Sequence, residues 1–320
     1  MEQRNLVLGI DIGGTNTALG LVDLEGRCHG TTTLPTLAKE PPDLYFPRLR
    51  AAAQTLLAAH GGTATLKGIG VGAPNANALT GMVEDPPNLA WGRVDLRERL
   101  EPDFGVPVSA TNDANAAALG ELYFGAAKGM ADVLVITLGT GLGSGLIVGG
   151  RLVLGCTGMA GELGHVTVDR AGRPCGCGRR GCLETYVSAT GLVNTVLAWL
   201  AESGRPSELR SVPAETITSK RIHEAALGGD PLALEAFAFT GTLLGQKLAD
   251  SVAHTSPQAI ILFGGLAHAG ELLFAPVREA LEANLFPPYR GTVRVLPSGL
   301  SDNAAVLGAA ALAWQHAESD

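Results

Sequence analysis

The hydrophobic and polar positions alternate in short runs that predict a mixed α/β chain. Residues 5–11 form a short apolar run, residues 13–16 form a glycine-rich turn, and residues 17–23 form a second apolar run. Two apolar runs joined by so few residues indicate a β-hairpin. Strands are then expected at 29–35, 67–74 and 106–111, and helices at 47–60 and 112–125. These elements amount to one α/β domain.

The second half of the chain begins with the same pattern. Residues 136–148 (ITLGTGLGSGLIV) repeat the order of strand, Gly/Thr turn and strand that residues 10–22 (IDIGGTNTALGLV) show earlier. This likeness predicts an internal duplication. Helices are expected at 183–203, 219–228, 231–254 and 271–284 and from about 303, strands at 258–265 and 292–297, and a surface loop at 204–216.

Composition and charge narrow the class of protein. Hydrophobic residues make up 46% of the chain and charged residues 17%, which is typical of a folded globular protein. The net charge is −8, with no basic tract to follow a nucleic-acid backbone, so nucleic acid is not an expected partner. The N-terminus lacks a signal segment, and no apolar run approaches the roughly 20 residues that span a bilayer. We therefore expect a cytoplasmic protein that does not bind membranes.

The two Gly/Thr turns suit phosphate groups. Each tip exposes backbone N–H groups with no bulky side chain nearby, and each threonine adds a hydroxyl donor. A single such tip could equally be an ordinary β-turn, but a matched pair favours phosphate binding. The Walker pattern is absent, and no GxGxxG sequence follows a strand and opens a helix, so neither a P-loop nor a Rossmann site is supported.

Residues 161–184 contain the ligands of a closed zinc site. A histidine and three cysteines in this stretch match the ligand number and type of a tetrahedral structural site. These four are His165, Cys175, Cys177 and Cys182. Disulfides are disfavoured by the expected reducing compartment, by the odd total of 5 cysteines and by the short Cys-Gly-Cys spacing. Cys28 and Cys156 lie outside the set and are expected to be plain buried thiols.

Five motifs in this order resemble the ROK family of bacterial sugar kinases, repressors and related proteins, most closely its glucokinase branch. The motifs are DIGGTNT, NDANAAALGE, LGTGLGSGL, GELGH and CGCGRRGCLE. The resemblance implies an actin-like, ribonuclease-H-like duplicated α/β fold, with a ligand cleft between two α/β domains. It divides the chain into a smaller domain, 1–115 completed by the helix at 303–320, and a larger domain, 116–302. Members of the family commonly form dimers, so a homodimer is expected.

The resemblance also implies roles for individual residues, with ATP, Mg²⁺ and a structural Zn²⁺ as cofactors. The residues expected to bind the nucleotide and its Mg²⁺ are Asp11, Gly13, Gly14 and Thr15 in the first loop, Gly139, Thr140 and Gly141 in the second, and Gly264 and Gly265 near the adenosine. Those expected around the sugar are Asn112, Asp113, Glu162, His165 and Glu184. Asp113 is the candidate base, and the zinc loop is expected to make the sugar ligands converge.

Several of these residues have structural alternatives. Asn112 or Asp113 could be only the N-cap of the following helix, and Glu184 could only complement a helix N-terminus. Asp11 could cap a turn. Glu162 could be only a solvated charge, and His165 could be only a zinc ligand. Asn75 and Asn88 could be turn residues or further sugar contacts.

The function expected from the resemblance is phosphorylation of D-glucose by ATP. Other neutral hexoses or N-acetylhexosamines (fructose, mannose, N-acetylmannosamine) are alternative acceptors. A sugar-responsive repressor would carry an N-terminal helix-turn-helix domain, whereas here the first core strand begins by Leu6. A filament-forming or chaperone-like member of the actin superfamily would have no reason for a zinc-organised sugar loop. We therefore expect a sugar kinase.

Overall fold

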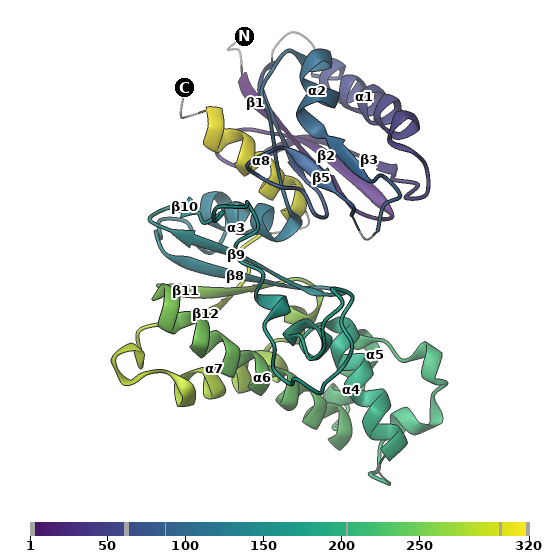
Figure 1. Ribbon diagram of the computed structural model, residues 1–320, viewed down its shortest axis with the longest axis vertical. Coiled ribbons are helices and arrows are strands. Elements are labelled where there is room, and N and C mark those ends of the chain that lie inside the picture. The colour runs from purple at the N-terminus through teal and green to yellow at the C-terminus, as the bar shows by residue number, and fades with distance from the viewer. Residues whose placement is uncertain (1–3, 61–63, 87, 203, 301–302, 318–320) are drawn as a thin grey trace. The chain divides into compact units, whose positions relative to one another are not determined.

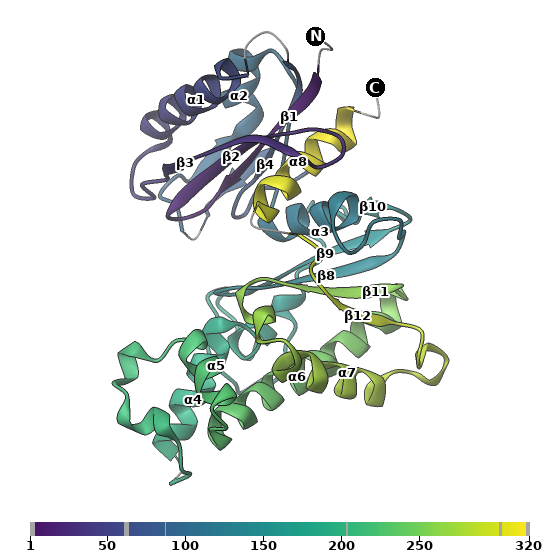
Figure 2. The same ribbon diagram turned by 180° about the vertical axis from the view of Figure 1, so that it is seen from behind.

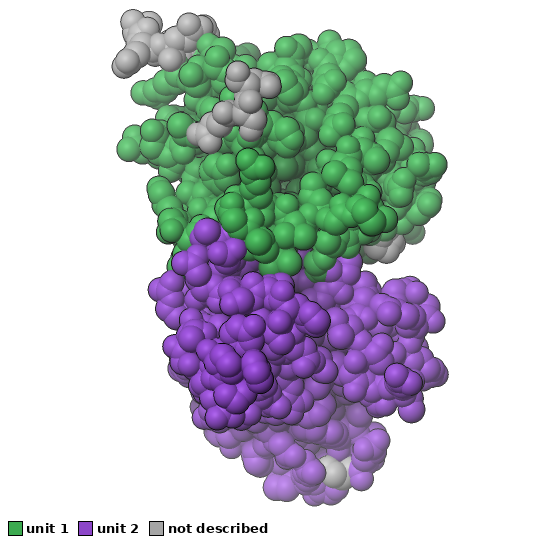
Figure 3. Space-filling view, turned by 60° about the vertical axis from the view of Figure 1, so that its left-hand side comes forward, with its two compact units in different colours: residues 1–130, 145–161, 298–320 green, residues 131–144, 162–297 purple. Residues whose placement is uncertain are grey.

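The computed structural model describes two compact units. The described residues are 4–60, 64–86, 88–202, 204–300 and 303–317. Unit 1 comprises residues 1–130, 145–161 and 298–320, and unit 2 comprises residues 131–144 and 162–297 (Figure 3). The predicted domains, 1–115 with 303–320 and 116–302, stay a prediction. The boundaries of the two compact units lie at other residues.

Unit 1 is built on a five-stranded sheet whose order is β3-β2-β1-β4-β7. Its strands are β1 (Arg4–Ile12), β2 (Asn16–Val22), β3 (Cys28–Pro35), β4 (Ala64–Gly72) and β7 (Val108–Thr111). The predicted hairpin is confirmed, because β1 pairs antiparallel with β2. The pairs β1–β4 and β4–β7 are parallel. Two short strands that the sequence pattern did not reveal, β5 (Met82–Glu84) and β6 (Arg93–Asp95), form a separate ribbon.

Helices cover both faces of this sheet. They are α1 (Pro42–Ala58), α2 (Leu96–Phe104), α3 (Asp113–Phe124) and α8 (Ala304–Ala317). The helix predicted from Pro47 begins at Pro42 instead, because proline suits the first position of a helix and Pro47 is accommodated one turn further on. Helix α2 was not predicted; it is short and polar, and it is capped by Asp95.

The alternation of β1 decides which residues face which helices. Leu6, Leu8 and Ile10 belong to the core that α1 and α2 share, whereas Val7 packs with α8. Figures 1 and 2 show α1 and α8 on opposite sides of the sheet. Gly9 also faces α8, since a Cβ built on it would lie 2.3 Å from the carbonyl oxygen of Val306. Successive residues of a strand face opposite sides of its sheet, so Asp11, two residues after Gly9, lies on the side that α8 covers.

The second sheet repeats the order of the first. Its order is β10-β9-β8-β11-β12, with β8 (Val133–Leu138), β9 (Leu142–Val148), β10 (Arg151–Leu152), β11 (Ala259–Phe263) and β12 (Arg294–Pro297). The strand β11 is parallel to both β8 and β12, as β4 is to β1 and β7. The equivalent placing of the two glycine-rich turns supports the predicted duplication.

Unit 2 also contains four α-helices and several 3₁₀ turns within the described ranges. The helices are α4 (Ala189–Glu202), α5 (Ser219–Leu227), α6 (Pro231–Thr255) and α7 (Glu271–Asn284). The 3₁₀ turns are η1 (Leu163–His165), η2 (Leu183–Thr185), η3 (Glu208–Ser211), η4 (Ala214–Thr216), η5 (Gly265–Ala269) and η6 (Pro287–Tyr289). The helix predicted from residue 183 begins at Ala189, because the chain first forms the separate turn η2. Among the described residues, no helix is long and apolar enough to cross a bilayer.

Candidate functional site

The first Gly/Thr turn follows directly on β1. The N–H of Gly13 donates to the carbonyl oxygen of Asn16 at 3.0 Å, which closes the turn. Gly14 lies against Asn88, whose Cβ would be 3.2 Å from a Cβ built on the glycine. Thr15 is exposed at the tip. The turn is therefore held by its own backbone and presents a small, open surface.

Two predicted site residues, Asn112 and Asp113, lie where β7 leads into α3. Asn112 is the N-cap, and its side-chain oxygen accepts a hydrogen bond of 2.7 Å from the N–H of Asn115. Asp113 is exposed, and its carboxylate accepts from the N–H of Ala114 at 2.9 Å. The capping role that was open for both residues thus belongs to Asn112. The exposed carboxylate of Asp113 is available for chemistry.

Asp11 and Asp113 form an acidic pair within unit 1. Burial and, to a smaller extent, the neighbouring Asp113 carboxylate raise the pKa of Asp11 to about 6. Gly72 of β4 makes room beside Asp11, since a Cβ there would lie 3.6 Å from its Oδ1. Two close carboxylates are a donor set that suits Mg²⁺, which prefers oxygen ligands, and a divalent cation would offset their repulsion.

The second Gly/Thr turn is joined to the glycines that follow β11. Gly139 and Thr140 are exposed, and the N–H of Gly139 donates to the carbonyl oxygen of Gly141 at 3.1 Å. Gly264 has a φ of 101°, and a Cβ on it would lie 2.7 Å from the carbonyl oxygen of Leu138. Only glycine fits this backbone conformation and this close approach. Gly264 and the exposed Gly265 are thereby brought to the base of the second turn.

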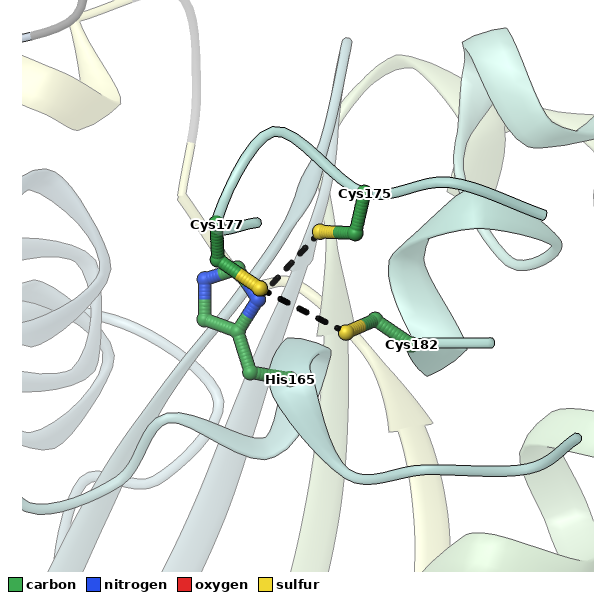
Figure 4. A group of neighbouring side chains, drawn as sticks. All are labelled: His165, Cys175, Cys177 and Cys182. Atoms are coloured by element: carbon green, nitrogen blue, oxygen red, sulfur yellow. Dashed lines mark hydrogen bonds between the residues drawn. The ribbon is translucent and has the colours of Figure 1, made fainter. Parts of the chain in front are cut away.

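The four predicted zinc ligands gather in unit 2. One donor atom from each lies within 4.8 Å of the others (Figure 4). The Sγ of Cys175 is 3.7 Å from Nδ1 of His165, and the Sγ atoms of Cys177 and Cys182 are 3.6 Å apart. A tetrahedral zinc ion with Zn–S bonds of about 2.3 Å and Zn–N bonds of about 2.0 Å separates its ligands by roughly 3.5 to 3.8 Å. The residues therefore fit zinc.

The thiols differ in their surroundings. Burial raises the pKa of Cys175, and the hydrogen bond that its thiol donates to Glu184 adds to this. Burial also raises the pKa of Cys182. The backbone and side chain of Arg179 instead lower the pKa of Cys177 to about 6. All three thiols can be ionised together at this spacing only beside a cation, and a bound metal ion would supply that positive charge.

The two remaining cysteines are unpaired, as expected, but only one is even partly buried. Cys28 is partly buried, and its thiol donates to the carbonyl oxygen of Gly30. Cys156 is exposed, which corrects the prediction that it is a buried thiol. Its surroundings explain the error, because glycines at 155 and 158 carry this stretch through turns rather than through the core.

The predicted sugar ligands of unit 2 surround His165. Its Nδ1 lies 3.5 Å from Oε1 of Glu184, and its Nε2 lies 4.0 Å from Oε2 of Glu162. The other oxygen of Glu184 faces the second turn, since a Cβ on Gly141 would be 2.9 Å from it. Glu184 therefore adjoins both the metal cluster and the phosphate-loop candidate. The predicted site residues thus form two groups, one in each unit.

Asn75 and Asn88 lie in turns, and Arg179 lies beside the metal cluster. Asn75 has a φ of 54°, and its amide donates to the carbonyl oxygens of Glu84 and Asp85, so it serves the turn. Asn88 lies beside the first turn. The sequence reasoning missed Arg179, although its place directly after the Cys-Gly-Cys-Gly sequence is a signal that could have revealed its contact with Cys177.

Comparison with known proteins decides the family. The model of the ROK family matches residues 7–316. The chain belongs to the ROK family. A glucokinase of Streptomyces coelicolor is 35% identical over 314 residues, which cover 96% of this chain and 97% of the relative. The xylose repressor of Bacillus spizizenii is 29% identical over 97% of this chain and 77% of its own length.

A solved structure agrees with the sequence relatives. The crystal structure of a ROK family glucokinase from Streptomyces griseus in complex with glucose and AMPPNP has a TM-score of 0.81 and 37% identity. The match covers 97% of this ROK chain and 99% of that one. The predicted family and the actin-like duplicated α/β fold are thereby confirmed, as is the predicted class of enzyme, a sugar kinase.

Proposed function

We propose that this ROK protein is a glucokinase, which transfers the γ-phosphoryl group of ATP to the 6-hydroxyl of D-glucose. The acidic pair of Asp11 and Asp113 is the observation that carries the proposal. An exposed carboxylate at a helix N-terminus, beside a second carboxylate of raised pKa, is the arrangement that a base and a metal-binding group need. The similarity to glucokinases supports the same assignment.

Asp113 accepts the proton of the sugar hydroxyl in this mechanism. The hydroxyl oxygen forms a bond to the γ-phosphorus while the bond from that phosphorus to the bridging oxygen breaks, and ADP leaves with the electron pair. Asn112 uses its side-chain oxygen for the cap, which leaves its NH₂ group as a donor to a neighbouring sugar hydroxyl. Mg²⁺ bound near Asp11 would supply neutralisation of phosphate charge.

The turns of both units serve the nucleotide. The N–H groups of Gly13 and Gly139 close their turns, which leaves the backbone N–H groups of Gly14 and Thr15 in the first turn, and of Thr140 and Gly141 in the second, to bind phosphate oxygens. Gly264 and Gly265 line the nucleoside without side chains in the way. Their closeness to the base of the second turn supports this assignment.

The sugar is held by charged acceptors on the zinc loop. Glu162 and Glu184 each accept hydroxyl donors, and hydrogen bonds to ionised groups are the stronger kind. His165 would hold zinc through Nδ1, which faces Cys175, and its Nε2, directed toward Glu162, would be left to meet the sugar. Zinc held there would be structural, because four protein ligands leave no open position for hydrolytic chemistry.

A non-catalytic sugar sensor is the second candidate, since a xylose repressor is also similar over nearly the whole chain. The acidic pair favours the kinase. A protein that only binds sugar does not need a buried carboxylate with a raised pKa, such as Asp11, whereas such groups are typical of catalytic sites. Other neutral hexoses remain alternative acceptors. An inverted hydroxyl can find a new partner or water, so mannose is expected to be a slower substrate. A homodimer and a cytoplasmic location stay predictions.

A coupled kinase assay tests the proposal. The protein is supplied with ATP and Mg²⁺, and kcat/KM is measured for glucose, mannose, fructose, N-acetylglucosamine and N-acetylmannosamine. We expect the highest value for glucose. A value about tenfold higher for another sugar would reject the glucokinase assignment. No turnover with any of the five, together with glucose binding, would favour the sensor.

A further inference from the structure

Arg173 is half-buried and lies two residues before Cys175. It has no role in the mechanism proposed above. Its guanidinium donates three hydrogen bonds. Nη1 donates to the carbonyl oxygens of Thr185 at 2.8 Å and Gly191 at 3.1 Å, and Nη2 donates to Oγ1 of Thr195 at 2.9 Å. Thr185 belongs to η2, and Gly191 and Thr195 belong to the first half of α4. One side chain thus holds a whole stretch of chain.

Tyr186 fixes the same arginine from another side. The guanidinium carbon lies 4.4 Å from the centre of the tyrosine ring, and the N–H of Arg173 donates to the tyrosine hydroxyl at 3.1 Å. The fit is close, because a Cβ on the preceding Gly172 would lie 2.3 Å from that hydroxyl. A planar cation stacked on a ring and bound in three places has little freedom to move.

The stretch that Arg173 holds touches both functional parts of unit 2. At one end, Glu184 precedes Thr185 and lies beside His165 and Gly141. At the other end, the N–H of Ala189 donates to the carbonyl oxygen of Gly139 at 2.9 Å. Residues 184–191 therefore connect the proposed sugar ligand to the second phosphate turn.

We propose that Arg173 is a positioning residue for phosphoryl transfer, which holds residues 184–191 so that Glu184 and the turn at Gly139 keep their geometry. The inference rests on the proposed function, in which Glu184 binds the sugar. Arg173 acts independently of the metal. Zinc would fix Cys182 at the beginning of the stretch, whereas Arg173 holds Thr185 and Gly191 further along the chain.

The first test replaces Arg173 by glutamine, which keeps a polar side chain but loses the charge and the three-way donor geometry. We expect the KM for glucose to rise about tenfold or more, because charged hydrogen bonds are among the stronger ones. The kcat is expected to fall less than about threefold, and the zinc content to stay at the wild-type value. Arg173→Lys keeps the charge and should give an intermediate KM. Arg170→Gln, an exposed arginine of the same loop, is the matched control.

Hydrogen exchange gives a readout that needs no turnover. In Arg173→Gln, the backbone amides of Ala189 and Gly191 should exchange faster than in the wild type, with zinc still bound. Should no hexose be phosphorylated by the wild type, the proposed function fails, but this exchange measurement still decides the role of Arg173. The inference is overturned by unchanged exchange at both amides, by a glucose KM within about twofold of wild type, or by zinc loss that parallels the rise in KM.

Discussion

The two Gly/Thr hairpins share one framework but carry different chemistry. Each begins at a strand that is parallel to the next strand of its sheet, and the two sheets have the same order. Two positions before the first glycine of the turn, the first hairpin has Asp11 and the second has Thr137. Thr137 serves the fold, because its hydroxyl accepts from the N–H of Gly143 at 3.2 Å. Asp11 instead lies where burial and the Asp113 carboxylate disfavour its ionised form and raise its pKa.

This difference shows where the duplicated framework has been specialised. A buried carboxylate with a raised pKa destabilises the folded protein whenever it is ionised, whereas a hydroxyl bonded to the backbone stabilises it. Local destabilisation of this kind is typical of functional groups. We therefore assign the charged chemistry to the first hairpin and a purely backbone role to the second, and each prediction below tests that division.

The largest effect is expected at Asp113, the partner of the first hairpin. Asp113→Asn keeps the size of the side chain and removes the basic carboxylate, so kcat should fall about 100-fold or more while the fold survives. Steady-state kinetics and a melting curve measure the two effects. Asp95→Asn is the control, because Asp95 caps α2 and should leave kcat unchanged. Near-normal turnover in folded Asp113→Asn would contradict the assignment of the base.

Asp11→Asn tests the charge on the first hairpin through stability. The folded pKa of about 6 lies above the ordinary aspartate value of 3.8, so the folded state binds the proton more tightly than the unfolded chain. The stability that this proton provides is complete below about pH 4 and is lost as the pH rises through about 6. Asparagine does not ionise, so the variant should be more stable than the metal-free wild type by up to about 3 kcal/mol at pH 8, and equal to it near pH 4.

Urea unfolding at these two pH values, without Mg²⁺ or nucleotide, measures the difference. Activity should be lost in the same variant. Thr137→Val is the counterpart in the second hairpin: it should cost about 1 kcal/mol at both pH values, since it removes a neutral hydrogen bond. If Asp11→Asn is no more stable than the wild type at pH 8, the folded protein does not disfavour the ionised form of Asp11.

The metal loop adjoins the second hairpin, through Glu184 and Gly141. We expect about one zinc ion per chain in the wild type, and Cys177→Ser removes one of the proposed ligands, so the zinc content should fall below that value and the KM for glucose should rise about tenfold. The stability difference between Asp11→Asn and its parent should persist in this background. Elemental analysis and kinetics check this together. Full activity in wild-type protein that contains no zinc would contradict a structural role for the metal.

The sequence predicted elements and motifs better than side-chain environments. Strand alternation and glycine turns are local, so both hairpins could be located from spacing alone, and spacing also pointed to the His/Cys set that clusters in the structure. The pKa of Asp11 could not be predicted, because it depends on burial in the folded protein and on Asp113, which is distant in sequence. Arg173 escaped notice for the same reason: its acceptors begin twelve residues further along the chain. Exposed Cys156 was misjudged because composition does not report local packing.

The smallest effect compares single glycines of the two turns. A Cβ on Gly139 meets no atom within 4 Å, whereas a Cβ on Gly13 would lie 2.9 Å from the carbonyl oxygen of Asn16. Gly139→Ala should therefore leave the free energy of unfolding unchanged and raise the KM for ATP about threefold, because the added methyl group obstructs only a bound phosphate. Gly13→Ala should lower stability by about 1 kcal/mol, because the backbone must shift. If Gly139→Ala changes neither stability nor the KM for ATP, the second turn does not bind phosphate, and the duplicated framework has kept only one functional tip.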